Sequence, residues 1–138
     1  MLRHFICALA LSTASTGLWA SPTAHPERLR LTPALLQRME AVQAASQAMA
    51  QDGADQDVDA ESVEDLARKL ESDPRIRSLL ARHRITTADY ATAVFATIHA
   101  ATFLAMESAA RRQDLAAALA SFTPEQRANI ELLRGLKK

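Results

Sequence analysis

The chain has 138 residues, of which 49% are hydrophobic and only 4% aromatic, with 16 basic and 16 acidic side chains. This length suits one ordinary domain. Three glycines and five prolines are too few for the turns of an all-β fold, and the balanced charge disfavours a nucleic-acid partner. Alanine, the best helix former, dominates the hydrophobic residues, so the composition favours an all-α protein.

Residues 1–20 have the pattern of an export signal. A short basic start is followed by the apolar stretch Phe5–Leu18 and then by Ala20, the small residue that a signal peptidase requires before its cut. The apolar stretch is about 14 residues long, short of the roughly 20 that span a bilayer. We predict cleavage between Ala20 and Ser21 and, for a Gram-negative source, a periplasmic location.

Cleavage would remove Arg3 and the only cysteine, Cys7, leaving 15 basic and 16 acidic residues. The mature chain would then have no disulfide, thiol nucleophile or thiolate metal site. Its stability must come from packing alone.

The mature chain is predicted to begin with a mobile tail over 21–31, followed by a helical bundle over 32–134. Thr32 and Pro33 supply a capping hydroxyl and a proline at the first helical position, and the first helix should end at Asp52–Gly53. Its apolar stripe comprises Leu35, Met39, Val42 and Met49, and Ser46 occupies the one position of the stripe that has no apolar residue.

Seven acidic residues and no basic ones occupy residues 52–65. Asp55, Asp57 and Asp59 alternate as in an EF-hand calcium loop, but the turn glycine would be Ala60 and the bidentate glutamate Leu66. We interpret the segment as a solvated acidic loop with at most weak, nonspecific cation binding.

A second helix is predicted over 60–72, capped by Asp59, and a third, short helix begins at Asp73–Pro74. Four arginines crowd this third helix, namely Arg75, Arg77, Arg82 and Arg84. They could bind anions such as lipid phosphates. The alternative, which we favour, is a solvated surface that balances the acidic loop.

The most apolar stretch of the mature chain lies between Asp89 and Glu107, where 17 consecutive residues carry no formal charge. We predict a central helix over about 87–110, capped by Thr86 and enclosed by the other helices. One side of it comprises Tyr90, Val94, Ile98, Ala101 and Ala105. Its length, alanines, threonines and His99 are not those of a membrane span, so no transmembrane segment is expected in the mature chain.

Two helices should complete the bundle. The first runs to Ser121 from a cap at Asp114, and the second begins at Thr123–Pro124 with Gln126 closing a capping box. Gly135 should end the last helix before a basic tail over 135–138. The predicted fold is thus an all-α, single-domain bundle of four to five main helices around the central one.

His99 is the most interesting polar residue, because it lies between Phe95 and Phe103 on the central helix, with Met106 nearby. These four residues could hold haem or a lipid-like molecule. The alternative, which we favour, is a core histidine bonded to a threonine or a backbone carbonyl. No haem-attachment, hydrolase, P-loop or dinucleotide-binding motif occurs, so we predict no enzyme activity, cofactor or metal site.

Two resemblances concern these segments. The Asp73–Pro74 start, the turn over 85–90 and the long alanine-rich helix together resemble small exported bacterial helical proteins of unknown function, across about residues 31–134. The run Phe122–Gln126 is similar to the Leu-Thr-x-x-Gln motif of the Spy/CpxP periplasmic chaperones, with phenylalanine in place of leucine. A second candidate copy, Leu31–Leu35, lacks the glutamine.

The leading functional hypothesis is a non-enzymatic exported protein that binds another envelope protein or an envelope component. The alternative is a small-ligand carrier that uses the surroundings of His99. A cavity of several hundred Å³ would favour the carrier, and a packed core with an exposed apolar groove would favour the interaction protein.

Overall fold

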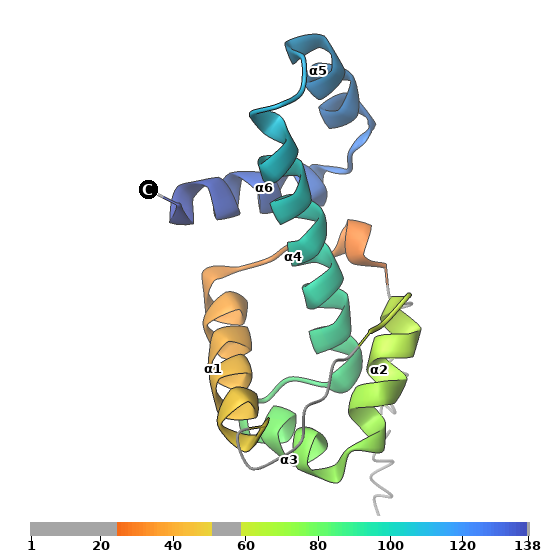
Figure 1. Cartoon of the computed structure of the whole chain (residues 1–138), viewed down its shortest axis with the longest axis vertical. Helices are drawn as coiled ribbons and strands as arrows, with labels where there is room; N and C mark the ends of the chain where they lie inside the picture. The colour runs from red at the N-terminus through yellow and green to blue at the C-terminus, as the bar shows by residue number, and fades with distance from the viewer. Residues whose placement is uncertain (1–24, 51–58, 138) are drawn as a thin grey trace, which may run out of the picture.

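The computed structural model describes residues 25–50 and 59–137, and every regular element in these two ranges is helical (Figure 1). A short 3-10 helix, η1 (Pro26–Arg28), precedes six α-helices. In chain order these are α1 (Pro33–Ala50), α2 (Val63–Ser72), α3 (Pro74–Arg82), α4 (Thr87–Glu107), α5 (Arg112–Ser121) and α6 (Pro124–Leu136). The all-α prediction is confirmed for the described residues, which hold six helices where four to five main ones were expected.

Helix α4 runs through the middle of the molecule (Figure 1). Its first half packs along α2, and its second half crosses α6. Four of its alanines are almost completely buried, and these are Ala91, Ala93, Ala96 and Ala100. Such small side chains let neighbouring helices approach closely. The helix ends at Glu107 rather than Ala110, because the amides of Ala109 and Ala110 share the carbonyl of Met106 in a tightened last turn.

The segment over 25–31, which we call the N-terminal strap, lies against α4 and α6. Leu31 is only 4% exposed, and its N–H donates to Oδ1 of Asn129 at 2.7 Å. The amide of Asn129 in turn donates to the carbonyl of Leu29 at 2.8 Å. A mobile tail was predicted for 21–31. Residues 25–31 pack as described, and residues 21–24 lie outside the described residues. In an extended segment alternate side chains point to opposite sides, so Leu29 and Leu31 turn inward while Arg30 turns outward.

Most helix starts follow the predicted caps. The hydroxyls of Thr32, Thr86 and Thr123 and the carboxylate of Asp73 each accept a hydrogen bond from a backbone N–H in the first turn. The capping box at Thr123 is complete, because the side chain of Gln126 also accepts from the Thr123 N–H at 2.9 Å.

Three boundaries differ from the predictions. Helix α2 is capped by Ser62 rather than Asp59, and it begins at Val63. Asp114 lies in the first turn of α5, whose N-cap position is taken by Arg111. Gly135 does not end α6, which continues through it to Leu136. A glycine is tolerated within a helix at modest cost, so it marks an end only when the flanking contacts also stop there.

Some predictions fall outside the described residues. These are the export segment over 1–20 with its cleavage site, the end of the first helix at Asp52–Gly53, and the acidic run up to residue 58. None of the helices formed by residues 25–50 and 59–137 is long and apolar enough to cross a membrane.

Candidate functional site: a cleft between α1, α2 and α4

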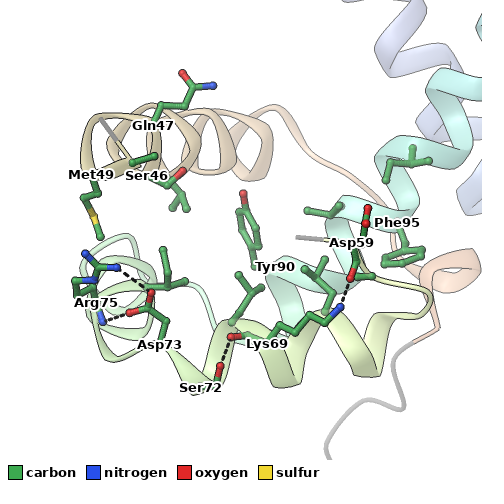
Figure 2. A pocket seen from close by; sticks show the side chains of 18 residues that line it. Ser46, Gln47, Met49, Asp59, Lys69, Ser72, Asp73, Arg75, Tyr90 and Phe95 are labelled. Carbon is green, nitrogen blue, oxygen red and sulfur yellow. Dashed lines mark hydrogen bonds and ion pairs between the residues drawn. The ribbon is translucent and has the colours of Figure 1, made fainter. Parts of the chain in front are cut away.

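A cleft of about 890 Å³ opens between α1, α2 and α4, with the first turn of α3 at one end (Figure 2). Ligand pockets are typically about 300–1,000 Å³ and mostly apolar. Most of the wall here is apolar, and it includes Val42, Met49, Leu66, Leu70, Val94 and Phe95. In size and in the character of its wall, the cleft matches a binding site for an apolar group.

The cleft opens beside the second half of α1. The first half of α1 packs with Ala93 and Ala96 of α4, through Leu35, Leu36 and Met39. Further along, Val42 is buried against Leu79, Leu80 and Ile85. Beyond Val42, the stripe of α1 reaches Ser46, whose hydroxyl donates to the carbonyl of Gln43 at 2.8 Å. A small side chain at this position leaves the space between α1 and α4 unfilled.

Tyr90 projects from α4 into the cleft, with its hydroxyl directed toward α1 (Figure 2). Burial raises the pKa of this hydroxyl above its ordinary value, so the group is protonated at neutral pH. Within the described part of the chain the Tyr90 side chain has no hydrogen-bond partner. It can therefore donate a hydrogen bond to a molecule that enters the cleft.

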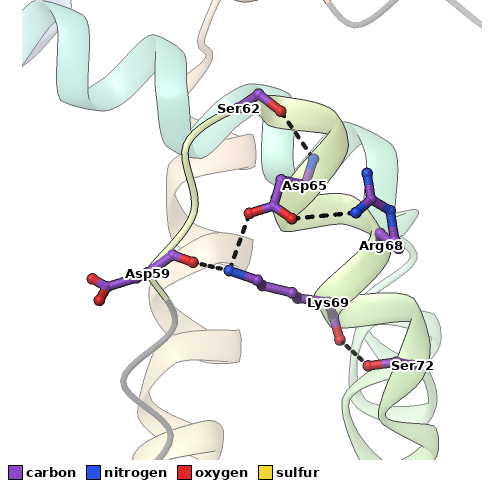
Figure 3. A network of polar contacts seen from close by, with 6 residues as sticks. All are labelled: Asp59, Ser62, Asp65, Arg68, Lys69 and Ser72. Atoms are coloured by element: carbon purple, nitrogen blue, oxygen red, sulfur yellow. Dashed lines mark hydrogen bonds and ion pairs between the residues drawn. The ribbon is translucent and has the colours of Figure 1, made fainter.

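One side of the cleft rim is formed by an ion-pair network on α2 (Figure 3). Nζ of Lys69 lies 3.0 Å from Oδ2 of Asp65, and it also donates to the backbone carbonyl of Asp59. The hydrogen bond from Lys69 is the main cause that lowers the pKa of Asp65. The ammonium group is thus held by partners on its own side of the cleft.

The end of the rim is formed by Asp73 and Arg75 at the start of α3 (Figure 2). Asp73 accepts the backbone N–H of Arg75 at 2.9 Å, which is the main cause that lowers the pKa of its carboxyl. The guanidinium of Arg75 lies 3.5 Å from the other carboxylate oxygen. Charge at this end is therefore balanced within the rim itself.

The structure separates the four residues predicted to form a ligand site. His99 is half-buried and packs edge-on against Phe122 at a centroid distance of 4.7 Å. Phe103 also meets Phe122, at 5.6 Å, on the α6 side of α4. Phe95 lies on the α2 side and lines the cleft, whereas Met106 is 58% exposed. Only Phe95 of this set belongs to the cleft.

His99 also differs from the predicted core histidine in its partner. Its Nε2 lies 3.5 Å from the side-chain amide nitrogen of Gln126, the residue that closes the capping box of α6. No threonine or backbone carbonyl pairs with the imidazole among the described residues. His99 therefore links α4 to the start of α6 and takes no part in the cleft.

The four predicted anion-binding arginines are all exposed on or just after α3. Arg75 pairs with Asp73, and Nη1 of Arg77 lies 3.7 Å from Oε1 of Glu71. A shallow hollow of about 430 Å³ lies between Arg77 and Arg84, beside the start of α4. These arginines form one basic end of the molecule, next to the cleft.

Sequence reasoning missed the role of Ser46 and Tyr90. Both residues had been placed on apolar stripes, but a stripe does not identify the helix that covers it. Within residues 25–50 and 59–137, no three His, Cys, Asp or Glu side chains lie close enough together to hold a metal ion.

Comparison of the chain with protein-family models, curated proteins and solved structures finds no match to any of the three. The two resemblances noted in the sequence stay predictions, and the functional argument rests on the geometry of the cleft.

Proposed function

We propose that this chain is an exported, non-enzymatic binding protein, and that the cleft takes the apolar part of a small lipid-like ligand. The observation that carries the proposal is a cleft of about 890 Å³ with a largely apolar wall and, inside it, the Tyr90 hydroxyl, which has no hydrogen-bond partner among the described residues. Buried apolar area would supply most of the affinity, and one hydrogen bond to Tyr90 would orient the ligand.

The charged rim supports binding rather than catalysis. Lys69, Asp73 and Arg75 are engaged with neighbouring groups of the protein, so none of them is placed to act as a general acid or base. Export rests on residues 1–20, whose pattern is that of a cleaved signal.

Haem fits the cleft less well than a lipid chain. No histidine lies among the residues that line it, and Met49 and Tyr90 are the side chains in its wall that could serve as axial ligands. The His99 site proposed from the sequence is also closed by Phe122 and Gln126. We therefore place the ligand beside Tyr90.

A second candidate function, binding of a helix from a partner protein, is favoured by the exposed part of α4. Ile98 borders the cleft and is 53% exposed, and Met106 is 58% exposed two turns further on. Amphipathic helices bind in apolar grooves, and these two side chains could contact such a helix. This is the structural basis for the leading hypothesis from the sequence.

The test uses Tyr90 as a reporter, because it is the only tyrosine in the chain. The only tryptophan, Trp19, lies in the predicted export segment, so the emission of the mature protein comes from Tyr90 alone. Titration with palmitate, or with the dye ANS, should change this emission in a saturable way. Saturation near one ligand per chain is the expected result.

A pair of serine variants makes this test specific. Ser46→Trp fills the cleft, whereas Ser121→Trp places the same side chain at the exposed end of α5. The two serines are matched, since each hydroxyl donates to the carbonyl three residues earlier. We expect Ser46→Trp to weaken ligand binding at least about tenfold, with ANS displacement as the readout, and Ser121→Trp to bind as the wild type does. Equal binding by both folded variants would refute the proposal.

A further inference from the structure

The exposed side of α3 is shaped to meet a flat anionic surface. At 100° per residue, Arg75 and Arg82 fall on one flank of this exposed side and Arg77 on the other. The residues between them, Ser78 and Ala81, are small and exposed. Because nothing bulky stands between the two flanks, all three guanidinium groups can reach one plane at the same time.

Arg84 extends this basic surface beyond the end of α3. It adopts a left-handed backbone conformation with φ of 54°, and its carbonyl accepts a hydrogen bond from Nη1 of Arg38 at 3.2 Å. Arg38, which lies on α1, thereby becomes the fifth arginine at this end of the molecule. We call Arg75, Arg77, Arg82 and Arg84 the arginine face.

The charge of the arginine face is only partly balanced. Asp73 and Glu71 pair with Arg75 and Arg77, whereas Arg82 and Arg84 have no acidic partner within the described ranges. Among residues 25–50 and 59–137 the face therefore keeps an excess of positive charge, which complements an anionic surface.

The arginine face and the cleft meet at Arg75. This residue lines the end of the cleft and also stands on the exposed flank of α3 (Figure 2). Helix α3 itself lies at one end of the molecule, across the ends of α1 and α2 (Figure 1). A group held on the arginine face is thus next to the apolar wall of the cleft.

We propose that the arginine face docks the protein on the anionic headgroups of a lipid bilayer, and that the acyl chain of such a lipid enters the cleft past Arg75. This inference rests on the proposed function, because it names the source of the lipid-like ligand. Each arginine near an anionic membrane strengthens binding roughly fivefold, and the attraction extends over about one Debye length, roughly 8 Å at physiological salt.

The test is flotation of the mature chain with vesicles of phosphatidylcholine, either pure or containing about one third phosphatidylglycerol. We expect binding to the anionic vesicles alone, decreasing as salt is added. The variant Arg77→Gln/Arg82→Gln removes two charges from the arginine face and should weaken vesicle binding roughly 10- to 30-fold.

The matched control is Arg111→Gln/Arg112→Gln at the start of α5. It makes the same change in charge at exposed positions on the opposite end of the molecule (Figure 1). This control should bind anionic vesicles within about twofold of the wild type. An equal loss in both variants would mean that net charge alone drives binding, and it would overturn the proposal. Absence of wild-type binding to the anionic vesicles would also overturn it.

Two further measurements distinguish a failure of bilayer docking from a failure of the proposed function. Inorganic phosphate at millimolar concentration should not release the protein from vesicles at constant ionic strength. Release would identify a site for free phosphate and would overturn bilayer docking. Palmitate binding in buffer tests the cleft without a membrane. Arg77→Gln/Arg82→Gln should keep it, so retained palmitate binding without vesicle binding would refute docking while leaving the proposed function intact.

Discussion

The two sides of α4 face their neighbours in contrasting ways. On one side, Ala93, Ala96 and Ala100 are buried in contacts with the N-terminal strap, α1 and α6, and this packing includes Ile130 and the hydrogen bonds of Asn129. We call this side, with the elements packed on it, the closed half. On the other side, Tyr90 and Val94 line the cleft.

The difference shows how one helix can serve both stability and binding. Where α4 presents alanines, neighbouring backbones come close enough for small residues and side-chain hydrogen bonds to fill the interface. Where it presents larger side chains toward the second half of α1, space remains. Stability should therefore depend mainly on the closed half, and ligand affinity on the cleft.

Truncation of two isoleucines should give the largest difference in the free energy of unfolding. Ile130 is 0% exposed in the closed half, whereas Ile98 borders the cleft and is 53% exposed. Ile130→Ala should lower the free energy of unfolding by about 2–5 kcal/mol because it leaves a cavity, and Ile98→Ala by less than about 1 kcal/mol. Urea denaturation measures both. Similar losses in the two variants would contradict the division into two halves.

For ligand affinity the order of the two isoleucine variants should be reversed. Ile98→Ala should weaken binding of palmitate, whereas Ile130→Ala, examined at a temperature where it is folded, should bind as the wild type does. A loss of affinity in Ile130→Ala alone would place the binding site in the closed half.

Asn129→Ala should have the next largest effect. Asn129 is 2% exposed and forms two hydrogen bonds with the N-terminal strap, one with Leu29 and one with Leu31. A third comes from the hydroxyl of Thr123, which donates to the carbonyl of Glu27. Removal of the Asn129 side chain leaves a buried backbone N–H without a partner, which should cost about 1–3 kcal/mol of unfolding free energy. Hydrogen exchange of the Leu31 amide should accelerate more than that of α2. Unchanged protection at Leu31 would show that the strap is held without Asn129, by its leucines and the hydrogen bond from Thr123 to Glu27.

The same residues show what the sequence could predict. The start of α6 follows from Thr123, Pro124 and Gln126, which act on one another within a single turn. The docking of the N-terminal strap depends on Asn129, which is 98 residues from Leu31. No periodic pattern near residue 31 reports a partner so distant along the chain, so the segment was predicted to be mobile.

The four residues of the predicted ligand site lie apart for a related reason. Phe95 and Phe103 are each four residues from His99, so both seem to flank it, but eight residues correspond to about 80° around a helix. One ring therefore faces α2 and the other α6. The cleft depends on how α1 is held away from α4, which is a property of tertiary packing. The sequence identified the stripe containing Tyr90 and Val94 but not the space in front of it.

Arg84→Gly should stabilise the protein by about 1 kcal/mol. Arg84 has a φ of 54°, and the amides of Arg84 and Ile85 bond to the carbonyls of Ala81 and Leu80, which is the Schellman arrangement after α3. Glycine adopts this conformation without the steric cost that arginine bears.

Arg82→Gly is the control for this prediction, because the same change inside α3 should destabilise by about 0.5–1 kcal/mol. Urea midpoints measure both variants. Destabilisation of equal size in the two variants would mean that the side chain of Arg84 contributes more to the free energy of unfolding than the strain of its backbone costs.

The smallest effect is a difference between the two halves in their response to acid. Helix α3, beside the cleft, is capped by the carboxylate of Asp73, whereas α6 in the closed half is capped by the hydroxyl of Thr123, which does not titrate in acid. The hydrogen bond from Arg75 holds the pKa of Asp73 below its ordinary value of 3.8. A carboxyl whose folded pKa is lowered stabilises the fold above the unfolded pKa, and that contribution is lost as the pH falls through the folded pKa.

Asp73→Asn and Thr123→Ala turn this difference into a measurement. Asparagine keeps a capping side chain but has no charge, so the wild type should be more stable than Asp73→Asn above about pH 4. The two should converge as the pH falls through the lowered pKa of Asp73. The deficit of Thr123→Ala, about 1 kcal/mol, should stay constant over the same range. Urea denaturation across this range gives both curves. Parallel curves for wild type and Asp73→Asn would show that the charge of Asp73 does not stabilise the end of the cleft, since only an ionised cap can lose its contribution to protons.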